Sequence, residues 1–331
     1  MVIMNKYVTI TLCLFLIGCV PEKTMRQDRI QHNTPNDQYL AAIGHGNSII
    51  AARHNAKAEL SNIFESRIES QLTIAASSVV DSMKGDHDTD EIHSSIKVFS
   101  RVQLKGLTVE DIQSKNGRYK ARAILDKIKA RKNWLSEIQK LDTLISVEYK
   151  ALNEMSPTVM SIRPIQKIWH YWMQRNALES RLTVIGFSAP HEQFQMKPIL
   201  QMMSDLQKQM QIKINIAGKH AKYLSDEIAG ILNNRGFLIT RDPAHATVVI
   251  KGNIDIHPLT NNSDWKFCRA IASIQIIDLL TGSQVCDINE TCRRGHLTQH
   301  EAYLKALKAV SQTVNNKLID FFDILGNKPI I

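Results

Sequence analysis

The first third of the chain combines short apolar runs with a segment of helical period. Residues 39–43 form an apolar run that predicts a strand, and Asn47 and Ser48 then precede apolar positions that recur every three or four residues, which predicts a helix. These positions are Ile49, Ala52, Ala56, Leu60 and Ile63. Residues 64–73 alternate in part and predict a strand, whereas residues 84–95 are polar and acidic and predict a loop.

A hairpin pattern follows this loop. Residues 98–104 and 106–113 read as strands, and Asn116-Gly117, a strong short hairpin signal, leads back into residues 118–125. We therefore expect an antiparallel sheet with the preceding helix across it.

Two apolar stripes of helical period occupy residues 127–180. They are separated at residues 155–158, which predicts a pair of antiparallel helices. The stripes are Trp134, Ile138, Leu141, Ile145, Tyr149 and Leu152, then Ile165, Ile168, Trp169 and Trp172. The aromatic residues 169–172 are open to two interpretations, a ligand or glycan platform and helix packing.

The period changes again in the last part of the chain. It predicts strands, a helix over residues 219–234, a long hairpin around Thr281-Gly282, and a final helix opened by the capping box Thr298-x-x-Glu301. The predicted strands are residues 181–187, 211–217, 237–240, 247–256, 267–280 and 283–292. We predict an α+β fold with two domains, each a mainly antiparallel sheet with helices on one face. These are residues 38–126 and 181–331, joined by a helical hairpin over residues 127–180.

The N-terminus has the pattern of a signal peptide. Lys6 is followed by an uncharged apolar stretch over residues 7–17, which is too short to span a bilayer. Leu16-Ile17-Gly18-Cys19 resembles the bacterial lipobox, which implies removal of residues 1–18 and acylation of Cys19, including palmitate. The alternative is an ordinary secretory signal with a chance cysteine.

The residues after Cys19 indicate which membrane the lipoprotein would occupy. Val20 stands where an Asp retains lipoproteins at the inner membrane of diderm bacteria, which implies the outer membrane and its periplasmic side. Residues 19–37 contain two prolines and few apolar side chains, so we expect a tether.

Two segments resemble known families. The run Gln38-Tyr-Leu-Ala-Ala-Ile-Gly-His-Gly-Asn-Ser, the alanine-rich helix after it and residues 117–126 are similar to the Lpp-twenty lipoprotein family, over about residues 38–150. Residues 242–252 and 276–282 resemble the amino-terminal domain of TolB. The order of the two units is similar to that in the flagellar assembly protein T, which has no lipid anchor. The resemblance implies an envelope protein and carries over no catalytic residue.

Composition and charge narrow the function classes. The chain is 44% apolar with 14 Gly and 9 Pro, which excludes collagen-like and wholly disordered proteins. A net charge of +9 favours anionic surfaces but is below that of a dedicated nucleic-acid binder, so no nucleic-acid partner is expected. Arg118, Lys120 and Arg122 share parity, so on a strand they project from one face and form a candidate anion-binding surface; the alternative is an ordinary solvated sheet face.

Other candidate chemistry is sparse. The acidic stretch 86–93 contains potential metal ligands in a spacing typical of no known site, and a polar surface loop is the favoured interpretation. Gly44-His45-Gly46 lacks the third glycine of a phosphate loop, so a tight turn is the alternative. Since no nucleophile elbow, zinc helix or Walker loop is present in the sequence, we expect no enzyme, no metal and no cofactor.

Removal of the signal peptide and acylation of Cys19 would leave three free thiols in an oxidising compartment. These are Cys268, Cys286 and Cys292. A two-residue turn would place Cys292 opposite Ile271, and a one-residue bulge would bring it near Cys268, so we predict a disulfide between Cys268 and Cys292 with Cys286 buried. The alternative is three reduced cysteines.

Together these patterns predict a non-catalytic outer-membrane lipoprotein that acts as an envelope scaffold or assembly factor, with flagellar and secretion machines as candidate contexts. Its expected partners are the membrane, through the lipid anchor, and envelope proteins, including a second copy of itself. The alternative is a periplasmic binding module for an anionic ligand or cell-wall polymer, and an enzyme ranks third.

Overall fold

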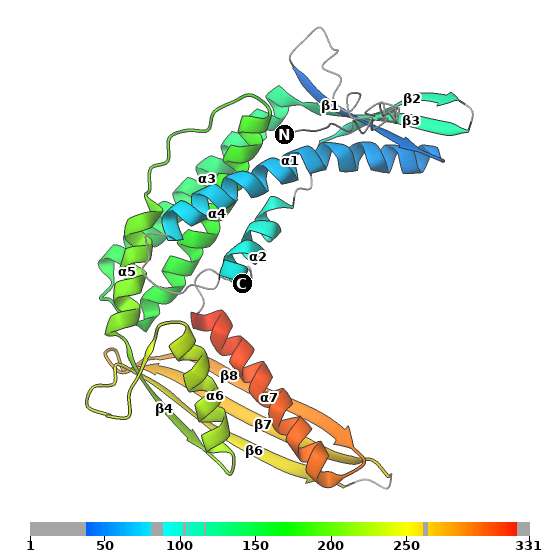
Figure 1. Cartoon of the computed structure of the whole chain (residues 1–331). Helices are drawn as coiled ribbons and strands as arrows, with labels where there is room; N and C mark the ends of the chain where they lie inside the picture. The colour runs from blue at the N-terminus through cyan, green and yellow to red at the C-terminus, as the bar shows by residue number, and fades with distance from the viewer. Residues whose placement is uncertain are drawn as a thin grey trace, which may run out of the picture.

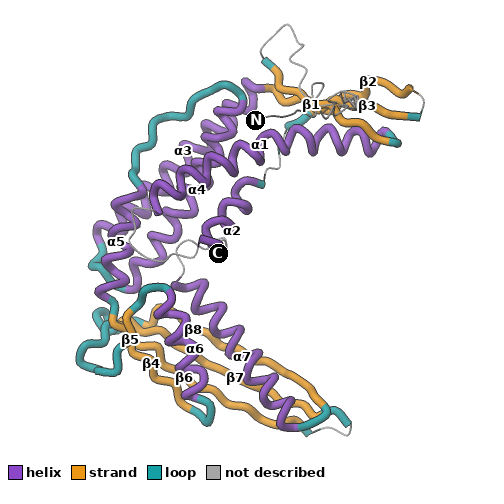
Figure 2. The backbone as a smooth tube through the Cα atoms, in the orientation of Figure 1, coloured by secondary structure: helices purple, strands orange, loops and turns teal. Residues whose placement is uncertain are grey.

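Two β-sheets lie at opposite ends of a curved helical body (Figures 1 and 2). The computed structural model describes residues 38–80, 89–101, 104, 106–115, 117–260 and 264–322. Its buried apolar side chains form one cluster that extends from the first strand to the last helix. The architecture is α+β, as the sequence predicts.

The first sheet has three antiparallel strands in the order β1-β3-β2. They are β1 (Tyr39–Gly46), β2 (Thr108–Lys115) and β3 (Arg118–Asp126), and helix α1 (Ile49–Val80) covers one face. Ala52 and Ala56 of α1 face Ala121 and Ala123 of β3, and all four are fully buried. Small side chains on both elements allow the helix to approach the strands closely.

Several predicted boundaries in this region are wrong. Residues 64–73 belong to α1, because Phe64, Ile68 and Leu72 continue its buried stripe at steps of four and are all 0% exposed. Helix α2 (Thr89–Ser100) replaces the expected loop from residue 89 and the start of the expected strand over residues 98–104.

The helical body is built on the predicted hairpin. Helices α3 (Lys127–Glu154) and α4 (Ile162–Val184) pack along each other, with the short 3₁₀ helix η1 (Val159–Ser161) between them. Asp126 caps α3 by accepting hydrogen bonds from the amides of Ile128 and Lys129, each at 3.0 Å. Helix α5 (Met196–Gln209), which the sequence did not predict, packs against α4 and α1.

The strand expected over residues 181–187 is also wrong. Helix α4 continues to Val184 and ends in a Schellman turn, in which the amide of Phe187 bonds to the carbonyl of Leu182 at 2.9 Å. Gly186 supports this ending because its φ of 84° lies in the left-handed region.

The second sheet has five strands in the order β5-β4-β6-β7-β8. The strands are β4 (Gln211–Ala217), β5 (Leu238–Ile239), β6 (Val248–Leu259), β7 (Lys266–Asp278) and β8 (Gln284–His296). Strands β5, β4 and β6 are parallel, whereas β6, β7 and β8 are antiparallel. Helices α6 (Ala221–Asn234) and α7 (Gln299–Phe322) cover one face of the sheet (Figure 1).

The second sheet is joined to the helical body by side-chain contacts. Gln166 of α4 donates its amide to the carbonyl of Phe321 at 3.0 Å, which satisfies the end of α7. The guanidinium carbon of Arg163 lies 5.9 Å from the centre of the Phe321 ring. The end of α7 is therefore tied directly to the start of α4.

Candidate functional site

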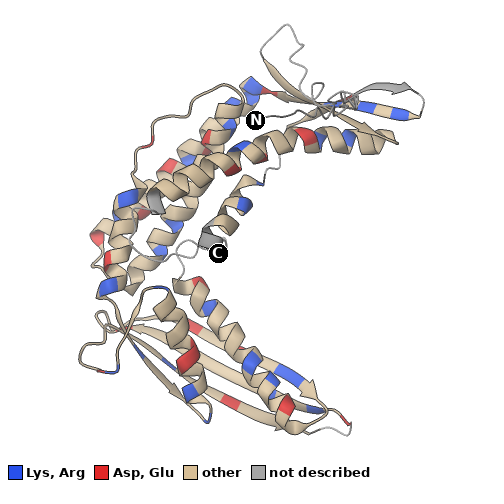
Figure 3. Ribbon diagram, viewed as in Figure 1, with Lys and Arg blue, Asp and Glu red and all other residues tan. Residues whose placement is uncertain are grey.

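The predicted basic residues of β3 share the outward face of the first sheet. Arg118, Lys120 and Arg122 alternate with Ala121 and Ala123, which are buried beneath α1. Figure 3 shows basic residues along this strand. An anionic ligand could therefore meet all three from one side.

The neighbouring strands set the charge around these cations. Lys120 lies opposite His45 of β1 and Gln113 of β2, whereas Arg122 lies opposite Glu110. Directly opposed unlike charges on a sheet attract each other, so Glu110 offsets part of the charge of Arg122. The positive potential is consequently strongest toward the hairpin end of β3.

Gly44 and Gly46 have a structural role that neither sequence interpretation anticipated. Both lie within β1, and neither has a positive φ, so they form neither a tight turn nor a phosphate loop. A Cβ atom on Gly44 would lie 2.0 Å from the backbone nitrogen of Ala56, and one on Gly46 would lie 2.6 Å from that of Ala52. These glycines let α1 cross the strand in contact with its backbone.

The tryptophans of α4 belong to the core. Trp169 is 1% exposed and Trp172 is 4% exposed, and their rings stack with centres 5.2 Å apart. They therefore serve helix packing and offer no platform to a ligand. Between them, His170 contacts the ring of Phe99, and burial lowers the pKa of its imidazole.

A buried charge network lies beside these tryptophans, and sequence analysis did not identify it. Arg175 of α4 is 1% exposed and donates to Asp142 of α3 at 2.8 Å, to Glu179 at 2.9 Å and to the carbonyl of Pro190 at 2.8 Å. The network joins the helical hairpin to the segment that leads into α5. Such a residue positions three parts of the fold at once.

Glu192 completes this network. Its carboxylate accepts a hydrogen bond from the indole nitrogen of Trp172 at 2.5 Å. Burial raises the pKa of Glu192, while the bond from Trp172 and the charge of Arg175 act in the opposite direction. Asp142 and Glu179 add to the upward shift, since like charges disfavour ionisation.

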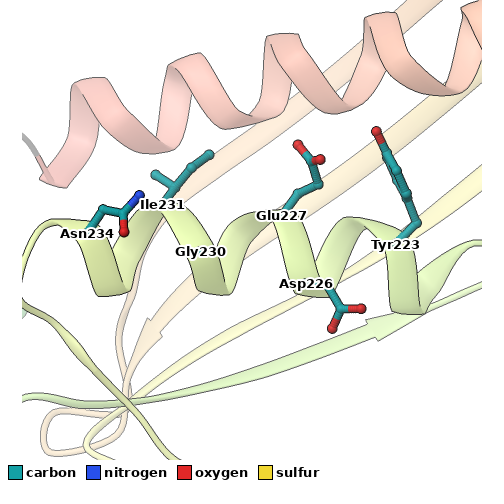
Figure 4. A pocket seen from close by; sticks show the side chains of 6 residues that line it. All are labelled: Tyr223, Asp226, Glu227, Gly230, Ile231 and Asn234. Carbon is teal, nitrogen blue, oxygen red and sulfur yellow. The ribbon is translucent and has the colours of Figure 1, made fainter.

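An open groove runs along α6, and all of its lining residues belong to that helix (Figure 4). Tyr223, Glu227, Ile231 and Asn234 point toward α7, whereas Asp226 points away from it. The groove has a volume of about 410 Å³, and Glu227 accepts a hydrogen bond from Asn315 of α7 at 3.0 Å. Burial, followed by the nearby charge of Glu227, raises the pKa of Tyr223. The groove thus holds acceptors and a neutral phenol.

A second groove, of about 500 Å³, lies between α1 and the end of α4. Its lining combines three hydroxyl side chains, two apolar side chains and one arginine. The residues are Ile63, Ser66, Arg67, Ser70, Thr183 and Val184.

The predicted disulfide is absent from the structure, and all three cysteines are free. A register shift between Ile276 and Ile277 places Cys292 opposite Ala270 and Cys268 opposite Arg294, so the two cysteines are diagonal and not directly opposed. Cys268 accepts a hydrogen bond from the amide of Gln299 at 2.8 Å. Burial raises the pKa of the Cys268 and Cys286 thiols, which keeps both protonated and unreactive. Cys286 is only partly buried, contrary to expectation.

The remaining candidates lie wholly or partly outside the described residues. These include Cys19, the signal peptide, the tether, and residues 86–88 of the acidic stretch, whose remainder belongs to α2. Within the described ranges, no three His, Cys, Asp or Glu side chains gather closely enough to hold a metal ion. No helix in that part of the chain is long and apolar enough to cross a membrane.

Comparison with known proteins gives partial structural likenesses. No protein-family model matches the chain, and no curated protein sequence does. A minor lipoprotein from Acinetobacter baumannii is 15% identical with a TM-score of 0.27, over 34% of this chain and 89% of its own. A secreted protein from Helicobacter pylori is 13% identical with a TM-score of 0.38, over 84% of this chain and 97% of its own.

A lipoprotein from Neisseria meningitidis is also similar, at 9% identity and a TM-score of 0.25, over 32% of this chain and 99% of its own. These neighbours are bacterial lipoproteins and a secreted bacterial protein. At these identities and TM-scores, the likeness assigns no activity to the chain.

Proposed function

We propose that this chain is a lipoprotein of the bacterial outer membrane, anchored through Cys19 and facing the periplasm, that acts as a non-catalytic scaffold or assembly factor. Its partner is another envelope protein or a second copy of the chain. The observation that carries the proposal is the placement of two sheets at opposite ends of one helical body, each with helices on a single face (Figure 1). Such a protein can present two separate faces at a fixed spacing.

The uncovered face of the second sheet is the surface that we assign to protein binding. Ile271 of β7 lies on this face and is 41% exposed, among mostly polar neighbours. A single exposed apolar side chain is ordinary on a protein surface, so the assignment rests on the uncovered sheet face, and Ile271 is the position that tests it. The stacked tryptophans of α4 are excluded as anchors by their burial.

The test is crosslinking in cells with a membrane-permeable reagent, followed by purification of the full chain in detergent and measurement of its mass by light scattering. We expect a crosslinked species of defined mass whose yield falls when Ile271→Asp is introduced. The matched control is Leu144→Asp on α3, because Leu144 is 42% exposed but lies on the helical body. A monomeric chain that forms no defined adduct, or equal loss in both variants, refutes the proposal.

A second candidate function is an anionic-ligand binding module, and the common face of Arg118, Lys120 and Arg122 favours it. This function predicts salt-dependent retention of the chain on an anionic polymer. Lys120→Glu would abolish retention, whereas Lys150→Glu on α3, an exposed lysine of the helical body, would leave it unchanged. A chain that binds no anionic polymer at low salt lacks this function.

A further inference from the structure

Three basic residues form one row across the uncovered face of the second sheet. His257 of β6 lies directly opposite Arg269 of β7, which lies directly opposite Arg293 of β8. All three are exposed, and basic residues near the carboxyl end of β8 are visible in Figure 3. Because neighbouring strands lie about 4.8 Å apart, the row spans roughly 10 Å.

This row is electrostatically unfavourable in isolation. Like charges that are directly opposed on neighbouring strands destabilise a sheet. Neither arginine forms an ion pair with a carboxylate in the described part of the chain. Asp255, in the adjacent row, lies opposite Ile271 and accepts a hydrogen bond from Asn253 at 2.5 Å. The two guanidinium groups therefore have no ion-pair partner among the described residues, and the carboxylate of Asp255 lies one row away.

The packing holds one of these groups in place. The guanidinium carbon of Arg293 lies 4.4 Å from the centre of the Phe267 ring. That ring in turn rests over Gly295, where a Cβ atom would lie 2.5 Å from ring atom Cε1. Gly295 thus leaves space for Phe267, and Phe267 supports Arg293 with the planar group stacked on an aromatic face. Because this packing already restricts the side chain, Arg293 would lose less conformational entropy on binding a ligand.

We propose that His257, Arg269 and Arg293 form a binding site for a phosphate group of a ligand. A carboxylate carries one charge and two oxygens, which one arginine satisfies in a bidentate pair. Two adjacent guanidinium groups and an imidazole match a group with about two negative charges and three or more acceptor oxygens, as in a phosphate monoester or pyrophosphate. The site lies on the other unit from the basic face of β3. It shares the uncovered sheet face with Ile271, and phosphate binding is tested on the chain without a protein partner.

The ligand has two possible sources with the same chemistry, a soluble phosphorylated compound and a phosphorylated lipid headgroup. Trp265, two residues before Phe267, is 51% exposed at the end of the β6–β7 hairpin. An exposed indole beside cations is typical of protein surfaces that meet lipid headgroups. The experiment therefore includes a probe of each kind.

The test uses the purified full chain in a non-ionic detergent at low salt, titrated calorimetrically with pyrophosphate and, separately, with a water-soluble short-chain phosphatidic acid. We expect one site for at least one probe, weakened about tenfold or more by Arg269→Gln and by Arg293→Gln. The matched control is Lys251→Gln, which removes an exposed cation from β6 on the same face, opposite Gln275 and away from the row. It should leave the affinity within about twofold.

The relative affinity of the two probes identifies the source of the ligand. Tighter binding of phosphatidic acid indicates a lipid headgroup, and tighter binding of pyrophosphate indicates a soluble compound. Phe267→Leu should weaken binding while both arginines remain, because Arg293 loses its support. Failure of both probes to bind overturns the proposal. So does an effect of Lys251→Gln as large as that of Arg293→Gln, since binding would then follow net charge alone. Circular dichroism of each variant establishes that the fold is retained.

Discussion

Replacement of Gly44 by alanine tests the contact between β1 and α1. A single methyl group at this position would lie 2.0 Å from the nitrogen and 2.6 Å from the Cα of Ala56, and 2.5 Å from the carbonyl oxygen of Ala52. All three atoms are backbone, so no side-chain rotation relieves the overlap. The strand and the helix must separate, which loosens the packing of Leu60 and Ala123, both 0% exposed.

The expected loss of stability is large for one methyl group. Overpacking of a core commonly costs about 1–3 kcal/mol, and occasionally more where the surroundings cannot adjust. Since the overlap here involves helix backbone, we expect about 3 kcal/mol or more. With a urea dependence of about 1–3 kcal/mol per molar, the unfolding midpoint should fall by roughly 1–3 M.

Tryptophan fluorescence during urea unfolding provides the assay. Trp134 of α3 packs edge-on against Phe64 of α1, with ring centres 5.8 Å apart, so its emission reports on α1. Gly230→Ala is the matched control, because a Cβ atom on Gly230 meets nothing within 4 Å and alanine is the better residue inside a helix by about 1 kcal/mol. Its midpoint should rise slightly. A Gly44→Ala variant with the wild-type midpoint would refute the proposed contact.

Three further changes have defined outcomes. Arg175→Leu leaves Asp142 without its buried partner and should lower the free energy of unfolding by about 3–5 kcal/mol in urea titrations, with part of the loss recovered when Asp142→Leu is added. Glu192→Gln keeps a side-chain oxygen that can accept the hydrogen bond from Trp172, and it removes a carboxyl group whose pKa is raised in the folded state. Wild type should therefore lose stability as the pH rises from the ordinary carboxyl pKa to the raised folded-state pKa, so in thermal melts the variant should match wild type below that range and be more stable above it. Cys19→Ser should leave an unprocessed, unacylated precursor by intact-mass spectrometry, and an acylated product would contradict the lipobox assignment.

The sequence predicted elements where a single pattern was decisive. The stripes that include Trp134 and Trp169 continue over several helical turns, so only a helix buries them. The pattern of residues 64–73 is ambiguous because an apolar residue at every fourth position fits both the helical period of 3.6 and the strand period of 2. Phe64, Ile68 and Leu72 share one face of a helix and would equally share one face of a strand. Only the packing of the whole of α1 along the helical body decides between them.

The buried network around Arg175 illustrates a different limit. Its partners Asp142 and Glu192 lie on another helix and on a loop, and no local spacing relates the three. Charged residues at such separations are ordinarily solvated, so a sequence pattern favours the surface for each of them. They become a network only because the turn between α3 and α4 sets the register of the two helices.

The proposed phosphate site depends on the register between β7 and β8, and a shift of one residue would remove it. A two-residue turn at Thr281-Gly282 would have paired β7 and β8 so that Arg293 lay opposite Ala270. Ala270 is buried on the face that α7 covers, so Arg293 would have pointed into the core. Instead, the turn spans more residues, with the amide of Asp278 bonded to the carbonyl of Ser283 at 2.9 Å, and the register shifts again between Ile276 and Ile277.

The net change is one position, which places Arg293 opposite Arg269 on the uncovered face. The same shift keeps Ile288 on the covered face, where it is 3% exposed beneath α7. Burial of this apolar residue favours the observed register, since a slip of one position would exchange the faces of every side chain in β8. Apolar packing on one side of the sheet therefore stabilises the like-charged arginine pair on the other, and bound phosphate would remove the remaining repulsion.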